Sequence, residues 1–165
     1  MISFVRVDNR LIHGQVVEAW LPHLKVARVV VADDEAAQSP LIRAAMGLAV
    51  PAHVEVVIRP LAEVDFPALT ADEVLTLVLF RDVASVVRAK DLGMDLAHLN
   101  LGNVHFATGK RQVSTSVFLS PDELAQLTRL AQAGAEVEAR GVPTDRPIAL
   151  AELVERFEKG GAQTR

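Results

Sequence analysis

The sequence predicts a three-layer α/β/α fold around a mainly parallel central sheet of about six strands. Short apolar runs rich in β-branched residues recur along the chain, and helical patterns separate them. Strands that alternate with helices indicate βαβ units, which place helices on both faces of a parallel sheet. The runs at 25–32 and 74–80 are apolar almost throughout, as expected for strands that are covered on both faces.

The first half of the chain predicts strands at 2–8, 25–32, 53–59 and 74–80. A helix is expected over 13–22, because apolar residues recur there at i, i+3, i+4 and i+7: Val17, Trp20, Leu21 and Leu24. Ser39 and Pro40 open a second helix over 41–48, as a cap and a first-turn proline. A short helical piece follows at 61–64.

The second half predicts a helix over 82–92 that ends at Gly93, a strand at 96–101 and a loop over 102–110. Partial alternation indicates a further strand at 112–119. Ser120-Pro121-Asp122-Glu123 is a strong helix start, and this helix is expected to reach residue 133. A strand at 136–140 and a last helix complete one domain over 1–158, and a frayed tail is expected over 159–165.

Composition excludes several classes of protein. The chain has 165 residues and no cysteine, so disulfides, a thiol nucleophile and a zinc–thiolate site are excluded. Acidic and basic residues are interspersed at a net charge of −4, which does not indicate a nucleic-acid partner. No apolar run reaches the length of about 18 residues needed to span a bilayer, so direct membrane insertion is not expected. We expect no metal either, since Asp33 and Asp34 fit a loop or helix cap.

The stretch 6–17, R-V-D-N-R-L-I-H-G-Q-V-V, joins the first strand to the first helix. Ligands of open α/β sheets bind at the carboxyl ends of strands, and the free N–H groups of a helix start attract anions. A neutral imidazole such as His13 can accept and pass on a phosphoryl group. Arg10 can hydrogen-bond two phosphate oxygens, and Asp8 can orient Arg10 or the second ring nitrogen. The alternative is that His13 only caps or packs beside the helix.

Two motifs resemble those of a known family. The segment R-V-D-N-R-L-I-H-G-Q-V is similar to the active-site segment of IIB components of the mannose/fructose/sorbose class of the bacterial phosphotransferase system. A second stretch, L-N-L-G-N-V-H-F-A-T-G-K-R-Q-V at 99–113, resembles that family's N-[VL]-G-x-x-H-F-x-x-G-K-[KR]-Q-[IV]. The resemblance covers about residues 2–158. Two departures are Asn9, and Asn103 where a second glycine is common; neither alters the expected chemistry.

The resemblance implies that His13 receives a phosphoryl group from a phosphohistidine of IIA, expected on a separate chain. His13 then passes it to a sugar bound by the membrane components IIC and IID. Phosphorylation at Nδ1 would place the phosphoryl group against the loop. The residues that we expect to bind phosphate are Asp8, Asn9, Arg10, Leu11, Ile12, Gly14 and Gln15. The resemblance implies no cofactor and a cytoplasmic location, peripheral to the membrane through IIC and IID.

Other residues are weaker candidates for contacts with the pocket or a partner. They are Arg81, Gly102, Asn103, His105 and Lys110. A nucleotide P-loop at Gly102–Lys110 is rejected, because six residues separate its glycines and Arg111 follows the lysine. His23, His53 and His98 lack the spacing of ligands and are expected to be structural, and Trp20 is expected to pack in the core.

The sequence therefore predicts a histidine-phosphorylated IIB phosphocarrier, a protein-histidine–sugar phosphotransferase. One alternative is a regulatory phosphorelay module that uses the same histidine without transporting sugar. Another is a non-catalytic α/β binding domain. The sequence does not name the sugar or the oligomeric state.

Overall fold

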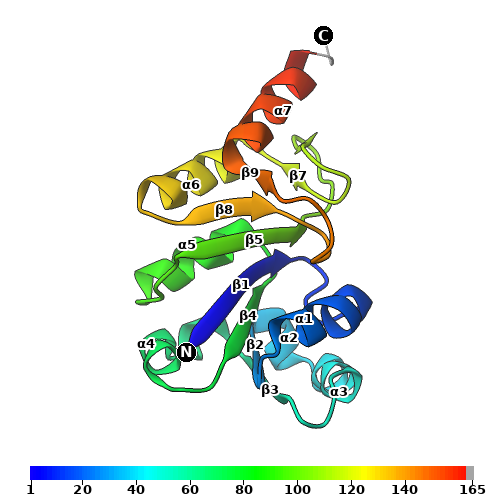
Figure 1. The fold of residues 1–165 in the computed structure, drawn as a ribbon, viewed down its shortest axis with the longest axis vertical. Coiled ribbons are helices and arrows are strands. Elements are labelled where there is room, and N and C mark those ends of the chain that lie inside the picture. The colour runs from blue at the N-terminus through cyan, green and yellow to red at the C-terminus, as the bar shows by residue number, and fades with distance from the viewer. Residues whose placement is uncertain (163–165) are drawn as a thin grey trace.

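A seven-stranded sheet with helices on both faces forms the centre of the computed structural model, which describes residues 1–162 (Figure 1). The spatial order is β3 (Glu55–Arg59), β2 (Arg28–Ala32), β4 (Thr76–Phe80), β1 (Ile2–Asp8), β5 (His98–Asn103), β8 (Glu136–Ala139) and β9 (Ile148–Ala149). All neighbours pair in parallel except β9, which is antiparallel to β8. The predicted fold class is confirmed.

The prediction of about six strands was low by one, because β9 has only two residues and shows no periodicity. The strand predicted over 112–119 was wrong. This segment forms a separate two-stranded sheet of β6 (Arg111–Gln112) and β7 (Phe118–Leu119). Both Val113 N and Ser114 N donate to Val117 O, so the chain turns over itself between them. Serine and threonine at 114–116 favour such a turn.

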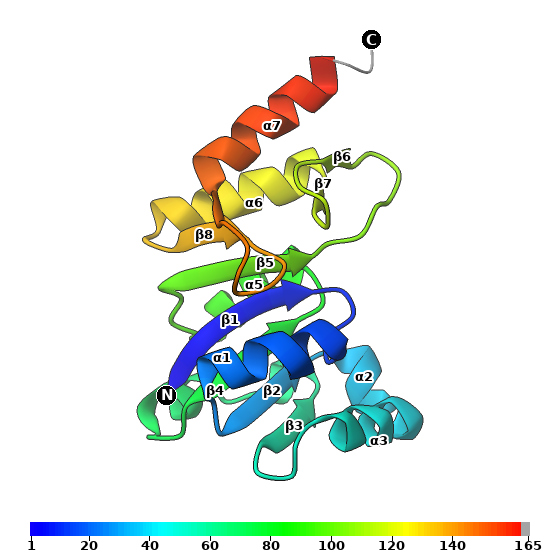
Figure 2. The same ribbon diagram turned by 45° about the vertical axis from the view of Figure 1, so that its right-hand side comes forward.

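One face of the sheet is covered by the first helical segments of the chain (Figure 2). These are η1 (Val16–Trp20), α1 (Leu21–Leu24), α2 (Asp34–Gln38) and α3 (Pro40–Ala49). The other face is covered by later segments: η2 (Leu61–Glu63), α4 (Phe66–Ala71), α5 (Val83–Asp91), α6 (Pro121–Gln132) and α7 (Leu150–Ala162). Each face has its own apolar cluster, with Val16 and Leu21 in one and Leu127 and Leu153 in the other.

The helix starts follow the predicted caps. The Ser39 hydroxyl accepts from Ile42 N, and Ser120 and Glu123 form a capping box at α6. At the end of α5, Gly93 has φ +94°, a conformation that favours glycine. The loop or cap reading of Asp33 is confirmed, because its carboxylate accepts from Ala36 N and caps α2. Sequence analysis missed α2 and α4, since five or six residues are too few to show helical periodicity.

Several boundaries differ from prediction, and three of these differences concern the site or the end of the chain. Helical structure begins at Gly14 rather than residue 13 and includes a π-helical turn over Val16–Trp20. The strand predicted to end at residue 101 continues through Asn103, which removes Gly102 and Asn103 from the predicted loop. The frayed tail does not begin at residue 159, since α7 continues to Ala162. Glycine weakens a helix by about 1 kcal/mol but does not by itself end it. Residues 163–165 of the predicted tail lie outside the described residues.

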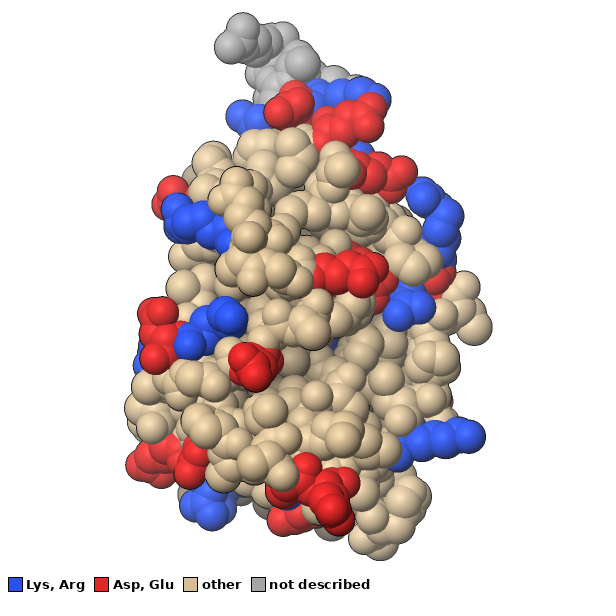
Figure 3. Space-filling model, turned by 60° about the vertical axis from the view of Figure 1, so that its left-hand side comes forward, with Lys and Arg blue, Asp and Glu red and all other residues tan. Residues whose placement is uncertain are grey.

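Over residues 1–162, no helix is both long enough and apolar enough to cross a bilayer. On the face shown in Figure 3, Lys and Arg side chains lie among Asp and Glu side chains and do not form a continuous basic surface.

Candidate functional site

The strand-to-helix loop lies at the point in the sheet where the order of the strands reverses. β1 and β5 are adjacent and parallel, but the chain after β1 leads to β2 on one side and the chain after β5 leads to β8 on the other. Such a switch point opens a crevice at the carboxyl ends of the two strands, where open α/β sheets bind ligands. Asp8 at the end of β1 is the register partner of Asn103 at the end of β5.

Backbone hydrogen bonds and buried side chains fix the loop after β1. Asn9 N donates to Asn103 O over 2.9 Å, and Leu11 N donates to Asp8 O over 2.9 Å. Leu11 has φ +58°, a left-handed conformation that costs a non-glycine residue about 1–2 kcal/mol. Burial of the Leu11 and Ile12 side chains offsets this cost and anchors the loop on the apolar cluster. Their side chains therefore hold the loop, and only their backbones remain to contact a phosphate.

His13 is oriented by Asp8. Its Nε2 lies 2.7 Å from Asp8 Oδ2, and the His13 side chain is only 8% exposed. Burial alone would raise the pKa of Asp8, but the hydrogen bond from His13, the charge of Arg6 and the hydrogen bond from Asn103 outweigh it, so the pKa is lowered. An ionised carboxylate can only accept a hydrogen bond, so in the neutral imidazole the proton lies on Nε2 and the lone pair on Nδ1.

Nδ1 of His13 is shielded from solvent and has no hydrogen-bond partner within the described chain. In the neutral ring with its proton on Nε2, this atom carries the free lone pair. Around it, Arg10, Gly14 and Gln15 are exposed and Asn9 is half-buried. Gly14 and Gln15 stand at the first helical turn, where amides lack intrahelical acceptors and can meet an anion.

Arg6 is a member of the site that sequence analysis did not select. Its guanidinium is fully buried and donates to Asp8 Oδ2 from Nε and Nη2, over 3.2 and 3.0 Å. From Nη1 it donates to Asn100 Oδ1 and to Arg140 O, over 2.7 and 3.1 Å. Burial lowers the pKa of Arg6, yet a guanidinium remains protonated at neutral pH. One signal was available, because an isolated charge in the buried run V-R-V needs a partner.

Gly102 and Trp20 enclose this guanidinium. A Cβ atom at Gly102 would overlap Arg6, so only glycine fits there. Both Arg6 and Arg140 stack on Trp20, each 5.1 Å from the ring centroid. Trp20 is fully buried, as predicted, and its Nε1 donates to Gly141 O. The first helix and the segment after β8 therefore hold Arg6 in place.

Of the weaker candidates, Asn103 contacts the site directly. Its Nδ2 donates to Asp8 Oδ2 over 2.9 Å and to Gln15 Oε1 over 3.1 Å. Arg81 forms a two-point ion pair with Asp33, which raises the pKa of Arg81. Lys110 pairs with Glu123, and His105 is exposed. None of these three side chains forms a hydrogen bond or ion pair with His13.

The contacts of Asp8 bear on the prediction that it orients either Arg10 or the second ring nitrogen of His13. Asp8 Oδ1 accepts from the backbone N of Arg10, whereas the Arg10 guanidinium has no hydrogen bond or ion pair within residues 1–162. The carboxylate thus orients the imidazole, and the Arg10 side chain remains unengaged.

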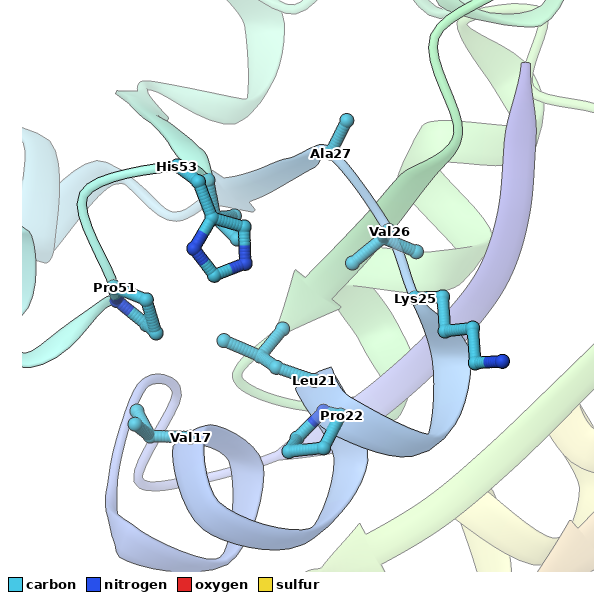
Figure 4. A pocket seen from close by; sticks show the side chains of 9 residues that line it. Val17, Leu21, Pro22, Lys25, Val26, Ala27, Pro51 and His53 are labelled. Atoms are coloured by element: carbon cyan, nitrogen blue, oxygen red, sulfur yellow. The ribbon is translucent and has the colours of Figure 1, made fainter.

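The remaining histidines lie elsewhere. His98 pairs with Glu138, and the His23 ring lies roughly perpendicular to the Trp20 ring. His53 and Lys25 line a mainly apolar pocket of about 470 Å³ between α1 and the segment before β3 (Figure 4). This pocket is separate from His13. No group of three acidic or histidine side chains suited to a metal occurs in the described part of the chain.

Comparison with known proteins agrees with this architecture. Residues 2–164 match the family model described as "PTS system sorbose subfamily IIB component". The "N-acetylgalactosamine-specific phosphotransferase enzyme IIB component 2" of Escherichia coli is 31% identical over 154 residues, covering 93% of this chain and 98% of that protein. The crystal structure of manxB from Thermoanaerobacter tengcongensis has a TM-score of 0.85 at 30% identity, covering 95% of this chain and 96% of that one.

A longer relative is the "PTS system mannose-specific EIIAB component" of Escherichia coli strain K12. It is 29% identical over 163 residues, which are 96% of this chain but 50% of that protein. The chain therefore spans about half the length of this curated relative.

Fold and site together define a three-layer α/β/α domain that presents a carboxylate-oriented histidine at a switch point of its sheet. The match over residues 2–164 makes the assignment specific: the chain belongs to the sorbose subfamily of IIB components of the phosphotransferase system.

Proposed function

We propose that the chain is a sugar phosphotransferase subunit in which His13 carries the phosphoryl group. The donor is a phosphohistidine of IIA, and the acceptor is a sugar bound by the membrane components IIC and IID. The observation that supports this most directly is the 2.7 Å contact between Asp8 Oδ2 and His13 Nε2, which leaves Nδ1 as the nucleophile. The proposed location is the cytoplasm, peripheral to the membrane through IIC and IID.

In the first transfer, the lone pair of His13 Nδ1 attacks phosphorus and the bond from phosphorus to the donor nitrogen breaks. The proton on Nε2 stays in place, because the buried Asp8 carboxylate stabilises the positive charge that the ring gains. In the second transfer, a sugar hydroxyl oxygen attacks phosphorus, the bond from phosphorus to Nδ1 breaks with its electron pair returning to Nδ1, and the hydroxyl proton passes to solvent. Since Nδ1 is shielded from solvent, the atoms that cover it have to move aside before either partner can reach it.

The side chains and amides around the ring suit the transferred group. Arg10 is exposed and unengaged, so its planar guanidinium can bind two phosphoryl oxygens. The first-turn amides of Gly14 and Gln15 can meet a third oxygen. The same exposed residues have to admit the donor and the acceptor, so we propose that the two docking surfaces overlap.

The regulatory phosphorelay is not favoured, because the matched family and the relatives are sugar-specific IIB components. Those relatives are named for different sugars, so their names do not select a sugar for this chain.

Reconstitution with phosphoenolpyruvate, the general phosphotransferase proteins and IIA tests the proposal. Mass spectrometry under conditions that preserve phosphohistidine should find one phosphoryl group, on His13. His13→Ala should abolish labelling, and the exposed His105→Ala should retain it. Undiminished labelling of His13→Ala would disprove the assignment.

A further inference from the structure

The outermost strand of the sheet, β3, has an open edge. β3 pairs only with β2 among the described strands, and it lies at the lower border of the sheet in Figures 1 and 2. Its residues, E-V-V-I-R, are exposed at the two ends and half-buried in the middle. An unpaired strand edge presents free backbone donors and acceptors to another chain.

The direction of the amides along β3 is set by its hydrogen bonds to β2. Glu55 N donates to Ala27 O over 2.9 Å, and Arg59 O accepts from Asp33 N over 3.0 Å. Because amides alternate in direction along a strand, the N–H and C=O groups of Val56 and Ile58 point away from β2. The free edge therefore offers the backbone groups of these two residues.

β3 is complementary to itself in the antiparallel direction. When Val57 faces the partner's Val57, Val56 faces the partner's Ile58 and Glu55 faces the partner's Arg59. Val56 and Ile58 then form the hydrogen-bonded pairs, in which both backbone bonds are exchanged. Glu55 and the partner's Arg59 form a non-hydrogen-bonded pair, the type in which side chains approach most closely.

Neither Glu55 nor Arg59 has a side-chain hydrogen bond or ion pair within residues 1–162, so both charges are available for this pairing. Other registers are worse. A shift of two residues in one direction sets Val56 against the partner's Pro60, which has no N–H to donate. A shift in the other direction sets Arg59 against the partner's His53 and leaves Glu55 without an opposite charge.

Space exists beside the edge on both faces of the sheet. A groove of about 390 Å³ lies between α3 and the outer face of β3, lined by Pro40, Arg43, Ala44, Gly47, Val56 and Ile58. A second groove of about 360 Å³, on the other face, includes Val57 and Arg59. Ala44 and Gly47 carry little side chain, which leaves this groove open between α3 and β3.

We infer that the β3 edge is a docking surface for a second copy of this chain, which joins two sheets through antiparallel β3 strands. The two copies are related by a two-fold axis at Val57, and both ion pairs between Glu55 and the partner's Arg59 form at once. The carboxyl edges of the two sheets point in opposite directions, so the His13 sites lie at opposite ends of the dimer and both remain open.

Sedimentation velocity over a concentration series tests this directly. The wild-type chain should form a reversible dimer. Glu55→Arg and Arg59→Glu should each weaken it about tenfold or more, because each replaces two attractions by two repulsions. The two variants mixed together should form a heterodimer, and the double variant Glu55→Arg/Arg59→Glu should recover the homodimer.

Glu158→Arg is the matched control, since Glu158 is also exposed and acidic but lies on α7, at the other end of the molecule (Figure 1). It should dimerise like wild type. Hydrogen exchange should show the amides of Val56 and Ile58 becoming protected as the concentration rises. A wild-type chain that stays monomeric at its highest soluble concentration would overturn the inference, and so would a dimer that is insensitive to both charge reversals.

Discussion

Arg6 and Asp8 stand two residues apart on β1 and form a fully buried ion pair, with Nη2 of the arginine 3.0 Å from Oδ2 of the aspartate. Residues at i and i+2 of a strand share a face, so β1 itself brings the two side chains together. The same carboxylate oxygen lies 2.7 Å from His13 Nε2. Arg6 therefore acts on His13 through Asp8, and does so from a position closed to solvent.

Replacing Arg6 by methionine should leave the Asp8 carboxylate buried without its counter-charge. Breaking a buried pair from one side costs about 3–5 kcal/mol, so the free energy of unfolding should fall by that order. Urea denaturation followed by circular dichroism measures the loss. Arg10→Met is the control, and its stability should match wild type because the Arg10 side chain is exposed and unengaged. Equal stabilities for both variants would show that Arg6 does not support the site.

Arg10→Lys should slow phosphoryl transfer while leaving the fold intact. A guanidinium meets two phosphoryl oxygens, whereas an ammonium acts as a point charge. A hydrogen bond to a charged group contributes about 1.5–3 kcal/mol, which corresponds to a loss of about 10- to 100-fold in rate. The single-turnover rate of transfer from phosphorylated IIA is the measurement. A folded Arg10→Lys chain that works at the wild-type rate would mean that backbone amides alone hold the phosphate.

Stability should fall in acid, and Asp8 should account for part of the fall. The pKa of Asp8 is lower in the folded chain than its ordinary value, against the effect of burial, because of His13, Arg6 and Asn103. A group of this kind contributes stability that is complete above its unfolded pKa of about 3.9 and is lost as the pH drops through the folded pKa. Unfolding free energies should therefore decline below about pH 4.

Asp8→Asn removes that titration, so its stability should depend less on pH in the same range. The pKa of Glu138 is also lowered, because His98 and Arg140 outweigh the effect of burial. Glu138→Gln should therefore also reduce the dependence of stability on pH, and it provides a comparison at a residue that does not contact His13. Asp8→Asn alone should also slow phosphoryl transfer, since it removes the charge that stabilises the ring. An Asp8→Asn chain with the acid dependence of wild type would contradict this account.

The sequence predicted the fold class and the place of His13 because long elements carry strong patterns. The capping box at Ser120 and the cap at Ser39 were readable for the same reason, since each is a local motif with a fixed spacing. Short elements were not readable. The strand β9 has two residues and the helix α2 has five, too few for either element to show its periodicity.

Within the site, local residues were predicted and distant partners were not. Asp8 and His13 lie in one motif, but Arg6 is held by Asn100 and Arg140, which are 94 and 134 positions away. Whether Asp8 contacts the Arg10 side chain or the His13 ring could not be read from the sequence, because both residues lie within five positions of Asp8. Arg81 and Lys110 were named as weaker candidates for contacts with the pocket or a partner, yet Asp33 and Glu123 engage them.

Two glycines of the site should respond in opposite ways to alanine. At Gly14 a Cβ atom would meet nothing within 4 Å, and φ is not positive, so Gly14→Ala should keep stability or raise it by about 0.5–1 kcal/mol. At Gly102 a Cβ atom would overlap the Arg6 guanidinium, so Gly102→Ala should destabilise the chain. Thermal denaturation of the two variants side by side measures this contrast.

For Gly14→Ala, the rate of phosphoryl transfer tests whether the space beside this residue is used in the reaction. The open space at Gly14 belongs to no part of the described chain, so in our proposal it is filled by the phosphoryl group and the docked partner. Gly14→Ala should consequently transfer more slowly than wild type although it folds at least as well. A Gly14→Ala chain with unchanged stability and an unchanged single-turnover rate would show that neither the phosphoryl group nor a partner approaches the start of this helix.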